Sequence, residues 1–333
     1  FAGIIALLIS RGFFGVRSQV FDWLGFLLVI LIWNHYKKTL SLKTLFWYIP
    51  LFFLWANIHA GFPIGFLMLG LMVCFDISDQ LRSSKKYQWT IRETYRVISI
   101  AGIICTAFVF TFINPYGIKL HQDIIRTLGN QTALQTIAEW QPSIVSSAAI
   151  LPFTIYTFSC ILLLMLYKRE KAFAVRDAIS VVMFLFLAFS SLRLIPFFIL
   201  VSLPIFARVF ADKEFFLPTL MLFIIPGFLI GSMYDKPTYK EPAIQPPVSQ
   251  SLSFPQSVIL PKDVFYAKAP MQALAYLRAR PMKGNMFNDY DWGGTIIWLF
   301  PEYKTFIDGR MSYWQLNGRE IFSDYSTIQN ITQ

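Results

Sequence analysis

The chain has 333 residues, of which 56% are hydrophobic and only 14% are charged, and its mean hydropathy is +0.53. This composition is typical of a protein with several membrane-spanning helices. The net charge of +10 does not indicate nucleic-acid binding, because residues 235–333 hold ten Lys and Arg against nine Asp and Glu, and no basic patch interleaved with aromatic residues is present.

Apolar runs separated by short polar breaks fill residues 1–234. Phe1 is not a start methionine and no charged segment precedes the first run, so we expect the chain to begin inside a helix of a longer protein. Several runs are shorter than the about 20 residues that a straight span needs. We predict an α-helical polytopic membrane protein with about eight or nine transmembrane helices. The runs are 1–10, 20–33, 45–56, 62–75, 97–113, 149–167, 179–192, 194–207 and 216–233.

The number of spans depends on a break at Arg193. As one helix, residues 179–207 would reach about 43 Å, which exceeds the about 30 Å of a hydrocarbon core. A single span would also leave Arg193 near the middle of the bilayer, where a charge is costly. We therefore predict two helices joined at Arg193; a single helix would reverse the side on which the C-terminal part lies.

Lys and Arg residues are distributed unequally between alternate breaks. One set of breaks holds fourteen: Lys37, Lys38, Lys43, Arg82, Lys85, Lys86, Arg92, Arg96, Lys168, Arg169, Lys171, Arg176, Arg208 and Lys213. The other set holds five: Arg11, Arg17, Lys119, Arg126 and Arg193. Because cytoplasmic loops carry the excess of Lys and Arg, we expect the second set, and everything after Tyr234, to be extracytoplasmic.

The C-terminal part has a different composition. Residues 235–268 are rich in Pro, Ser and Gln and predict an extended linker. Residues 269–333 predict a small extracytoplasmic α/β domain that is cut short. We expect a helix from Pro270 to near Pro281, a short strand at Met286 and Phe287, a helix or strand at 294–300, and a strand at 305–307.

The predicted extracytoplasmic breaks hold polar side chains at the ends of apolar runs. A polar side chain there must face water, a headgroup or a protein cavity. The simplest interpretation is that these residues cap helices and anchor spans at the interface. The alternative is a binding site, since an acid, an imidazole and two guanidinium groups gather on one side: Arg17, Gln19, Asn57, His59, Asn114, Glu139, Trp140 and Arg193.

Six short motifs resemble a family of bacterial multi-pass membrane proteins of the GT-C glycosyltransferase type, a poorly characterised group. They are Arg17-Ser-Gln-Val20, Trp55-Ala-Asn-Ile-His-Ala-Gly-Phe62, Asn114-Pro-Tyr-Gly117, Glu139-Trp-Gln-Pro142, Asn288-Asp-Tyr-Asp-Trp-Gly-Gly294 and Phe306-Ile-Asp-Gly-Arg310. The resemblance covers nearly the whole chain, from the first motif to the last. Ser18 stands where the resemblance predicts Pro, and Ala60 where it predicts Gly; neither change removes a reactive group.

The resemblance implies an enzyme of the bacterial inner membrane. Such an enzyme transfers a sugar from a polyprenyl-phosphate donor to a cell-envelope glycan, lipid or protein on the extracytoplasmic face. It also implies an acidic residue in the first extracytoplasmic loop as base or metal ligand. No Asp or Glu occurs before Asp22, which lies inside the predicted run 20–33, so we expect that acid to precede Phe1.

Glycosyl transfer from a lipid phosphate needs a carboxylate to accept the hydroxyl proton and cations or a metal to stabilise the leaving phosphate. Glu139 is the acid we select as base, and Trp140 is placed to stack on a sugar ring. Arg17, His59 and Arg193 are the expected phosphate partners. The three histidines show no zinc-ligand spacing. A Mg²⁺ or Mn²⁺ ion bound by carboxylates stays an alternative.

Acidic residues also occur together in the C-terminal part, where Asp289, Asp291, Asp308 and Arg310 form a second candidate site. Asp before Trp-Gly-Gly is also an ordinary helix N-cap, and Asp308-Gly309 an ordinary turn, so we favour a structural role for them. The alternative function for the whole chain is a non-enzymatic transporter or envelope-assembly subunit. A transporter predicts ionisable residues at mid-span and two related halves, and no internal repeat is evident.

Overall fold

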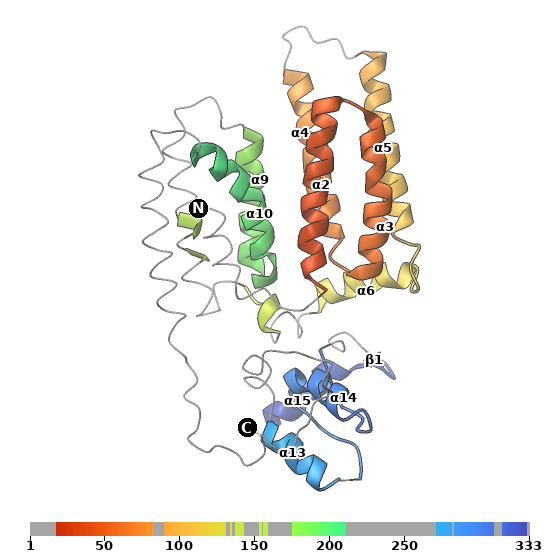
Figure 1. The fold of residues 1–333 in the computed structure, drawn as a ribbon, viewed down its shortest axis with the longest axis vertical. Helices are drawn as coiled ribbons and strands as arrows, with labels where there is room; N and C mark the ends of the chain where they lie inside the picture. The colour runs from red at the N-terminus through yellow and green to blue at the C-terminus, as the bar shows by residue number, and fades with distance from the viewer. Residues whose placement is uncertain are drawn as a thin grey trace, which may run out of the picture. The chain divides into compact units, whose positions relative to one another are not determined.

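The computed structural model describes residues 18–82, 90–130, 134, 137–142, 153–154, 156–158, 175–210, 271–281, 283–309 and 315–331. In these ranges the chain is mostly helical, with one two-stranded sheet (Figure 1). Arg17, Arg310, the linker 235–268 and the predicted spans 1–10 and 216–233 lie outside the described residues, as does most of the predicted span 149–167.

The chain divides into two compact units. The first contains residues 1–125 and 135–235, and the second contains residues 126–134 and 236–333. The first unit therefore holds the predicted transmembrane runs. The second holds the C-terminal part, together with the short segment 126–134, which the sequence assigns to the membrane domain.

The first unit begins with four main helices. They are α2 (Val20–Thr39), α3 (Tyr48–Ile58), α4 (Pro63–Arg82) and α5 (Ile91–Phe110), and the 3-10 helix η2 (Leu42–Trp47) precedes α3. Leu40 ends α2 in a left-handed conformation, with φ of 54°. Pro63 begins α4 at the position where its missing N–H costs least. Thr90 and Glu93 begin α5 with a reciprocal capping box.

The chain continues with α6 (Ile118–Gly129), of which residues 118–125 belong to the first unit and 126–129 to the second. The first unit also contains η3 (Ala138–Trp140), α9 (Val175–Ser190), η5 (Leu192–Leu194) and α10 (Ile195–Phe210). The predicted break at Arg193 is confirmed, because α9 and α10 are separate helices joined by Ser191 and η5. The two helices pack against each other. The break places Arg193 at a helix end and away from the middle of a long helix.

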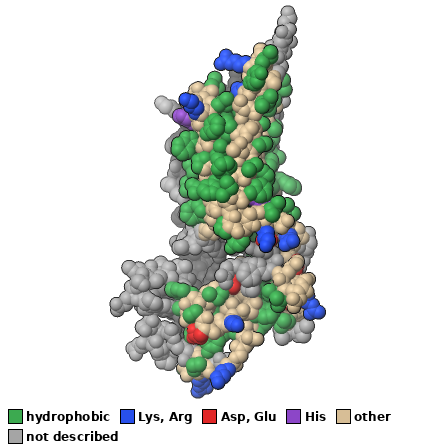
Figure 2. Space-filling model, turned by 90° about the vertical axis from the view of Figure 1, so that its right-hand side faces the viewer, with side chains coloured by type: hydrophobic (Ala, Val, Ile, Leu, Met, Phe, Trp, Pro, Cys, Tyr) green, Lys and Arg blue, Asp and Glu red, His purple; other side chains and the backbone are tan. Residues whose placement is uncertain are grey.

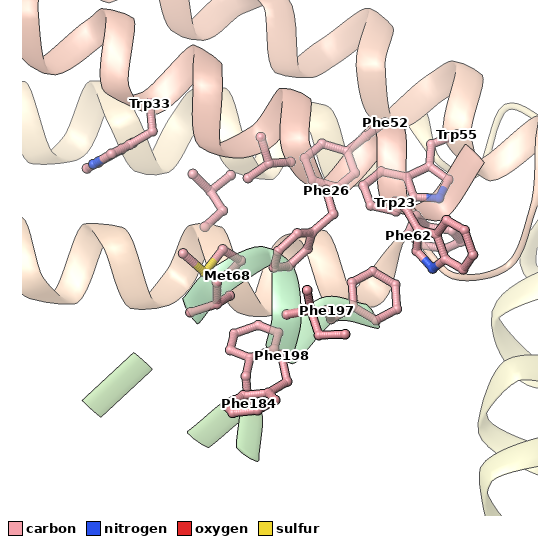
Figure 3. Close-up of a cluster of buried hydrophobic side chains, with 14 of the residues drawn as sticks. Trp23, Phe26, Trp33, Phe52, Trp55, Phe62, Met68, Phe184, Phe197 and Phe198 are labelled. Carbon is pink, nitrogen blue, oxygen red and sulfur yellow. The ribbon is translucent and has the colours of Figure 1, made fainter. Parts of the chain in front are cut away.

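Aromatic side chains form the core of this unit (Figure 3). Phe26 of α2 lies with its ring 5.3 Å from that of Phe184 in α9 and 5.1 Å from that of Phe197 in α10. Phe52 of α3 stacks on Phe66 of α4, with ring centroids 3.8 Å apart. Edge-to-face and offset contacts of this kind add about 0.5–1.5 kcal/mol per pair beyond the area buried. These contacts join α2, α3 and α4 to the pair α9 and α10.

Two of the described helices are long and apolar enough to cross a membrane, at Pro63–Leu81 and Ile91–Phe110. Two further apolar helices, Leu42–Ile58 and Leu192–Ile205, are shorter. Figure 2 shows hydrophobic side chains over much of the visible helical part, with Lys and Arg near its ends. Since buried helices of soluble proteins have the same composition, the eight or nine predicted spans stay a prediction.

An ion-pair cluster joins three of these helices near the C-terminal end of α2. Asp76 of α4 is buried and forms ion pairs with Lys37 of α2 and with Arg96 of α5, whose Nη2 lies 2.6 Å from Oδ2. Gln80 donates a hydrogen bond to the same carboxylate. Three cationic breaks that the sequence assigns to one side are thereby brought together, since Arg176 of α9 also pairs with Asp79, at 3.2 Å.

The second unit contains α13 (Met271–Ala279), η7 (Tyr290–Trp292), α14 (Gly293–Leu299), β1 (Gln315–Leu316), β2 (Arg319–Glu320) and α15 (Ile321–Ile331). The helix expected after Pro270 is confirmed as α13. The strands expected at 286–287 and 305–307 are wrong, because only an isolated bridge joins Met286 to Thr305. The antiparallel hairpin of β1 and β2, and α15, are not predicted by the sequence. This part is more helical than the expected α/β domain.

Candidate functional site

A buried carboxylate lies in the first turn of α2. Asp22 is 3% exposed, and its Oδ1 accepts a hydrogen bond from the indole Nε1 of Trp55 at 2.7 Å. The Trp55 ring is held in place by close packing, because a Cβ atom on Gly25 of α2 or on Gly65 of α4 would overlap it. A buried charge is tolerated only when it is paired, and the positive end of α2 also favours a carboxylate here.

His59 supplies the other partner of this carboxylate. It ends α3, and its Nδ1 lies 2.7 Å from Oδ2 of Asp22, which is an ion-pair distance, although the oxygen lies off the line along which a ring N–H donates best. The side chain of His59 is 18% exposed, whereas that of Asp22 is 4% exposed. The imidazole is therefore the part of the pair that a solute can reach.

Gly61 permits the close approach of the α3–α4 turn to Asp22. A Cβ atom at this position would overlap the Asp22 carboxylate. The motif that contains His59 therefore has Gly at position 61 for a packing reason. The sequence suggests a tight turn here, and the structure adds the buried group against which the turn packs.

Arg193 lies on the opposite side of the His59 ring. Its Nη2 is 3.0 Å from Nε2 of His59, and its guanidinium carbon lies 6.0 Å from the centre of the Trp140 ring, within range of a cation–π contact. Two hydrogen bonds tie η3 to the turn before α10: Ser191 Oγ donates to the Glu139 carbonyl at 3.1 Å, and the Leu192 N–H donates to the Gln141 carbonyl at 3.1 Å. We call Asp22, Trp55, His59, Trp140 and Arg193 the His59 cluster.

The other residues that the sequence selects in this part have mainly backbone partners. Asn57 donates to the carbonyls of Phe53 and Ile113, at 2.8 and 2.9 Å, and thus ties α3 to the segment after α5. Asn114 accepts from the Tyr116 N–H and donates to Thr111 in the turn before α6. Gln19 is buried at the N-cap of α2. The structure gives Asn57 and Asn114 the capping role that the simpler interpretation describes.

Glu139, the predicted base, is half-buried in η3 next to Trp140. Its backbone carbonyl accepts the Ser191 hydroxyl, so η3 and the Arg193 turn are held together. This hydrogen bond ties the segment that contains Glu139 and Trp140 to the turn that carries Arg193.

The helix α6 follows the turn at Asn114. Its exposed apolar residues Ile118, Ile125 and Leu128 share one face, while Leu120 and Ile124 pack on the core. His121 stacks on Phe112, with ring centroids 4.0 Å apart, and accepts or donates a hydrogen bond with Thr111. Burial against these rings lowers the pKa of His121 below its usual value, so its ring favours the neutral form.

Two of the acidic residues that the sequence selects in the C-terminal part, Asp289 and Asp308, lie in positions with a structural role. Asp289 caps η7 by accepting from the Asp291 N–H at 2.9 Å. The sequence predicts the cap at Asp291, directly before Trp-Gly-Gly, whereas the N-cap position of α14 is Trp292. Asp308 is buried, and a Cβ atom on Gly293 would overlap its backbone. Asn288 links this turn to the segment 306–307, because its side-chain amide donates to the carbonyl of Ile307 and accepts from the N–H of Phe306. Burial raises the pKa of Tyr325, whose hydroxyl accepts the Tyr290 N–H.

Among the residues that the structure describes, no group of three or more His, Cys, Asp or Glu side chains is placed to hold a metal ion. Both oxygens of the most buried acid at the site, Asp22, already contact Trp55 and His59. No family model matches the chain, and neither the curated proteins nor the solved structures contain a significant match. The geometry of the His59 cluster is therefore the basis for a functional proposal.

Sequence reasoning missed three members of this arrangement. The sequence places Asp22 inside the predicted run 20–33 and gives it no role. It identifies Trp55 only as part of a motif, and it assigns Gly61 to a turn without the group against which the turn packs. The available signal was the charge itself, because an acid near the end of an apolar run needs a partner. Sequence reasoning does predict that His59 and Arg193 converge, and the structure brings them together across 134 positions of sequence.

Proposed function

We propose that the chain is part of a polytopic membrane glycosyltransferase. It transfers a sugar from a polyprenyl-phosphate donor to a cell-envelope acceptor on the extracytoplasmic face of a bacterial inner membrane. The observation that carries this proposal is the His59 cluster, where a guanidinium, an imidazole and an indole meet beside a buried carboxylate at the end of apolar helices. Ionisable groups within membrane-spanning segments cost free energy, and they usually mark substrate sites.

Each half of a polyprenyl-phosphate sugar has a matching group in the cluster. The planar guanidinium of Arg193 suits a phosphate, to which it can donate two parallel hydrogen bonds. The centre of the Trp140 indole lies 6.0 Å from the guanidinium carbon of Arg193. The indole offers an apolar surface for a sugar ring beside the phosphate. The prenyl chain would extend between the apolar helices, whose exposed side chains include Phe21 and Leu24 of α2.

The positions of the charged groups favour an enzyme over a transporter. Asp22 and His59 lie at one end of α2 and α3, and Lys37 lies near the other end of α2, about 22 Å away at about 1.5 Å per residue. A transporter would place its ionisable residues near mid-span between two related halves. The exposed apolar face of α6, with Lys119 nearby, suits a helix that lies along the membrane surface beside the site.

The proposal is tested by replacing Arg193. In full-length protein reconstituted in vesicles, Arg193→Ala should weaken the binding of polyprenyl phosphate about tenfold to a hundredfold, because each charge-assisted hydrogen bond to phosphate contributes about 1.5–3 kcal/mol. The matched control is Arg176→Ala, which removes the same charge from a half-exposed ion pair with Asp79. Equal affinities of the two variants would leave Arg193 as a structural residue and remove the support for a donor site.

A further inference from the structure

The His59 cluster contains a chain of three groups whose order has a chemical consequence. A carboxylate, an imidazole and a guanidinium follow one another, with contacts of 2.7 Å from Asp22 to Nδ1 of His59 and 3.0 Å from Nε2 to Arg193. The guanidinium has only N–H donors and no acceptor. Nε2 must therefore be the acceptor, and the ring proton is on Nδ1, the nitrogen that lies 2.7 Å from Oδ2 of Asp22.

This tautomer is the one that a general base requires. A carboxylate beside Nδ1–H orients the imidazole and stabilises the cation that forms when Nε2 takes up a proton. The carboxylate is itself fixed, because Asp22 is 3% exposed and its other oxygen is bonded to Trp55. In this structure, however, the lone pair of Nε2 is occupied by Arg193.

We infer that Arg193 is a latch on His59: an anionic phosphate that enters the site draws the guanidinium away from Nε2, and the imidazole becomes free to act as a base only when the donor is bound. This inference rests on the proposed function, because it assigns the phosphate to the lipid donor. Asp22 is then a positioning residue, which acts through His59 and does not touch the substrate.

The exchange of partners is favourable for Arg193. Its bond to His59 joins a cation to a neutral nitrogen, whereas a phosphate offers a charged partner and two parallel hydrogen bonds. The bond to phosphate therefore gains the attraction between two opposite charges, which the bond to a neutral imidazole nitrogen lacks. The Arg193 side chain is long, and the short helix η5 between α9 and α10 carries it at a position that is only half-buried.

The released groups complete one transfer step. The acceptor hydroxyl gives its proton to Nε2 of His59 while its oxygen forms a bond to the anomeric carbon of the sugar. The bond from that carbon to the phosphate oxygen breaks, and its electron pair stays on the polyprenyl phosphate, whose added negative charge lies against Arg193. The His59 cation that results lies beside the Asp22 carboxylate and later returns its proton to water.

Nitrogen-15 NMR of His59 in the full-length protein tests the latch. The chain has three histidines, so the His59 resonances are those that disappear in His59→Gln. Without ligand, we expect a neutral ring with its proton on Nδ1. Polyprenyl phosphate in vesicles should move the Nε2 resonance to the position that it has in Arg193→Ala without ligand, and Arg193→Ala should show no further movement.

Two further comparisons distinguish lipid phosphate from free phosphate as the anion, and the latch from the proposed glycosyltransferase function. Inorganic phosphate without the lipid should produce the same movement only at much higher concentration, and movement at equal concentrations would assign the latch to free phosphate and overturn the lipid donor. An unmoved Nε2 resonance in protein that binds polyprenyl phosphate, or a ring proton on Nε2, would overturn the latch. Movement of the resonance without sugar transfer would support the latch and contradict the glycosyltransferase.

Discussion

Replacement of His59 by Gln should lower the rate of sugar transfer by about 10²–10⁴-fold, which is the usual contribution of a general base. Gln retains a hydrogen-bonding group of similar reach but cannot take up the acceptor proton. The measurement is transfer of labelled sugar from a polyprenyl-phosphate donor by purified full-length protein. Because donor binding depends chiefly on Arg193 in this scheme, the affinity for the donor should change much less than the turnover.

Two further substitutions make this result specific. His35→Gln makes the same chemical change on an exposed residue near the other end of α2, and its turnover should equal that of the unchanged protein. Glu139→Gln compares the base that the sequence predicts with the one that the geometry favours. A larger loss at Glu139 than at His59 would assign the proton transfer to Glu139 and contradict the role given to His59.

Gly61→Ala should be strongly destabilising, because the added Cβ atom would overlap the buried carboxylate of Asp22. Displacing that carboxylate from Trp55 and His59 would break a buried pair, which costs about 3–5 kcal/mol. We expect a clear decrease in the thermal unfolding midpoint of the protein in detergent, together with loss of polyprenyl-phosphate binding.

Gly70→Ala is the matched control for this prediction. Gly70 lies in α4, nine residues after Gly61, and a Cβ atom there would have no heavy atom within 4 Å. Alanine is favoured over glycine inside a helix by about 0.5–1 kcal/mol, so the midpoint should stay the same or rise. Equal midpoints for the two variants would show that the turn before α4 does not pack against Asp22 as described.

The sequence predicts local features well where they depend on one run of residues. The break at Arg193 follows from the length of an apolar stretch and the cost of a charge inside it, and α13 follows from Pro270 and the apolar spacing after it. α15 was missed because its sequence, Ile321 to Ile331, mixes polar and apolar residues without a strong pattern. The two-residue strands β1 and β2 are too short for an alternating pattern to appear.

The candidate site was predicted in part, and the missing part depends on contacts between distant segments. His59 and Arg193 could be grouped because both lie at ends of runs that the charge pattern places on one side. The role of Asp22 could not be predicted, since an acid in an apolar run has the same sequence signal whether it faces lipid, water or a histidine. Its pairing with His59 is a property of how α2 packs against the turn between α3 and α4.

The most direct test is donor turnover by the unchanged full-length protein in vesicles that contain a radiolabelled polyprenyl-phosphate sugar and cell-envelope acceptors. We predict that labelled sugar appears on the acceptor and that polyprenyl phosphate is released in equal amount, with both products absent when the vesicles lack the protein. Tight binding of the donor with neither product formed would contradict the glycosyltransferase and would leave the His59 cluster as a binding site for lipid phosphate.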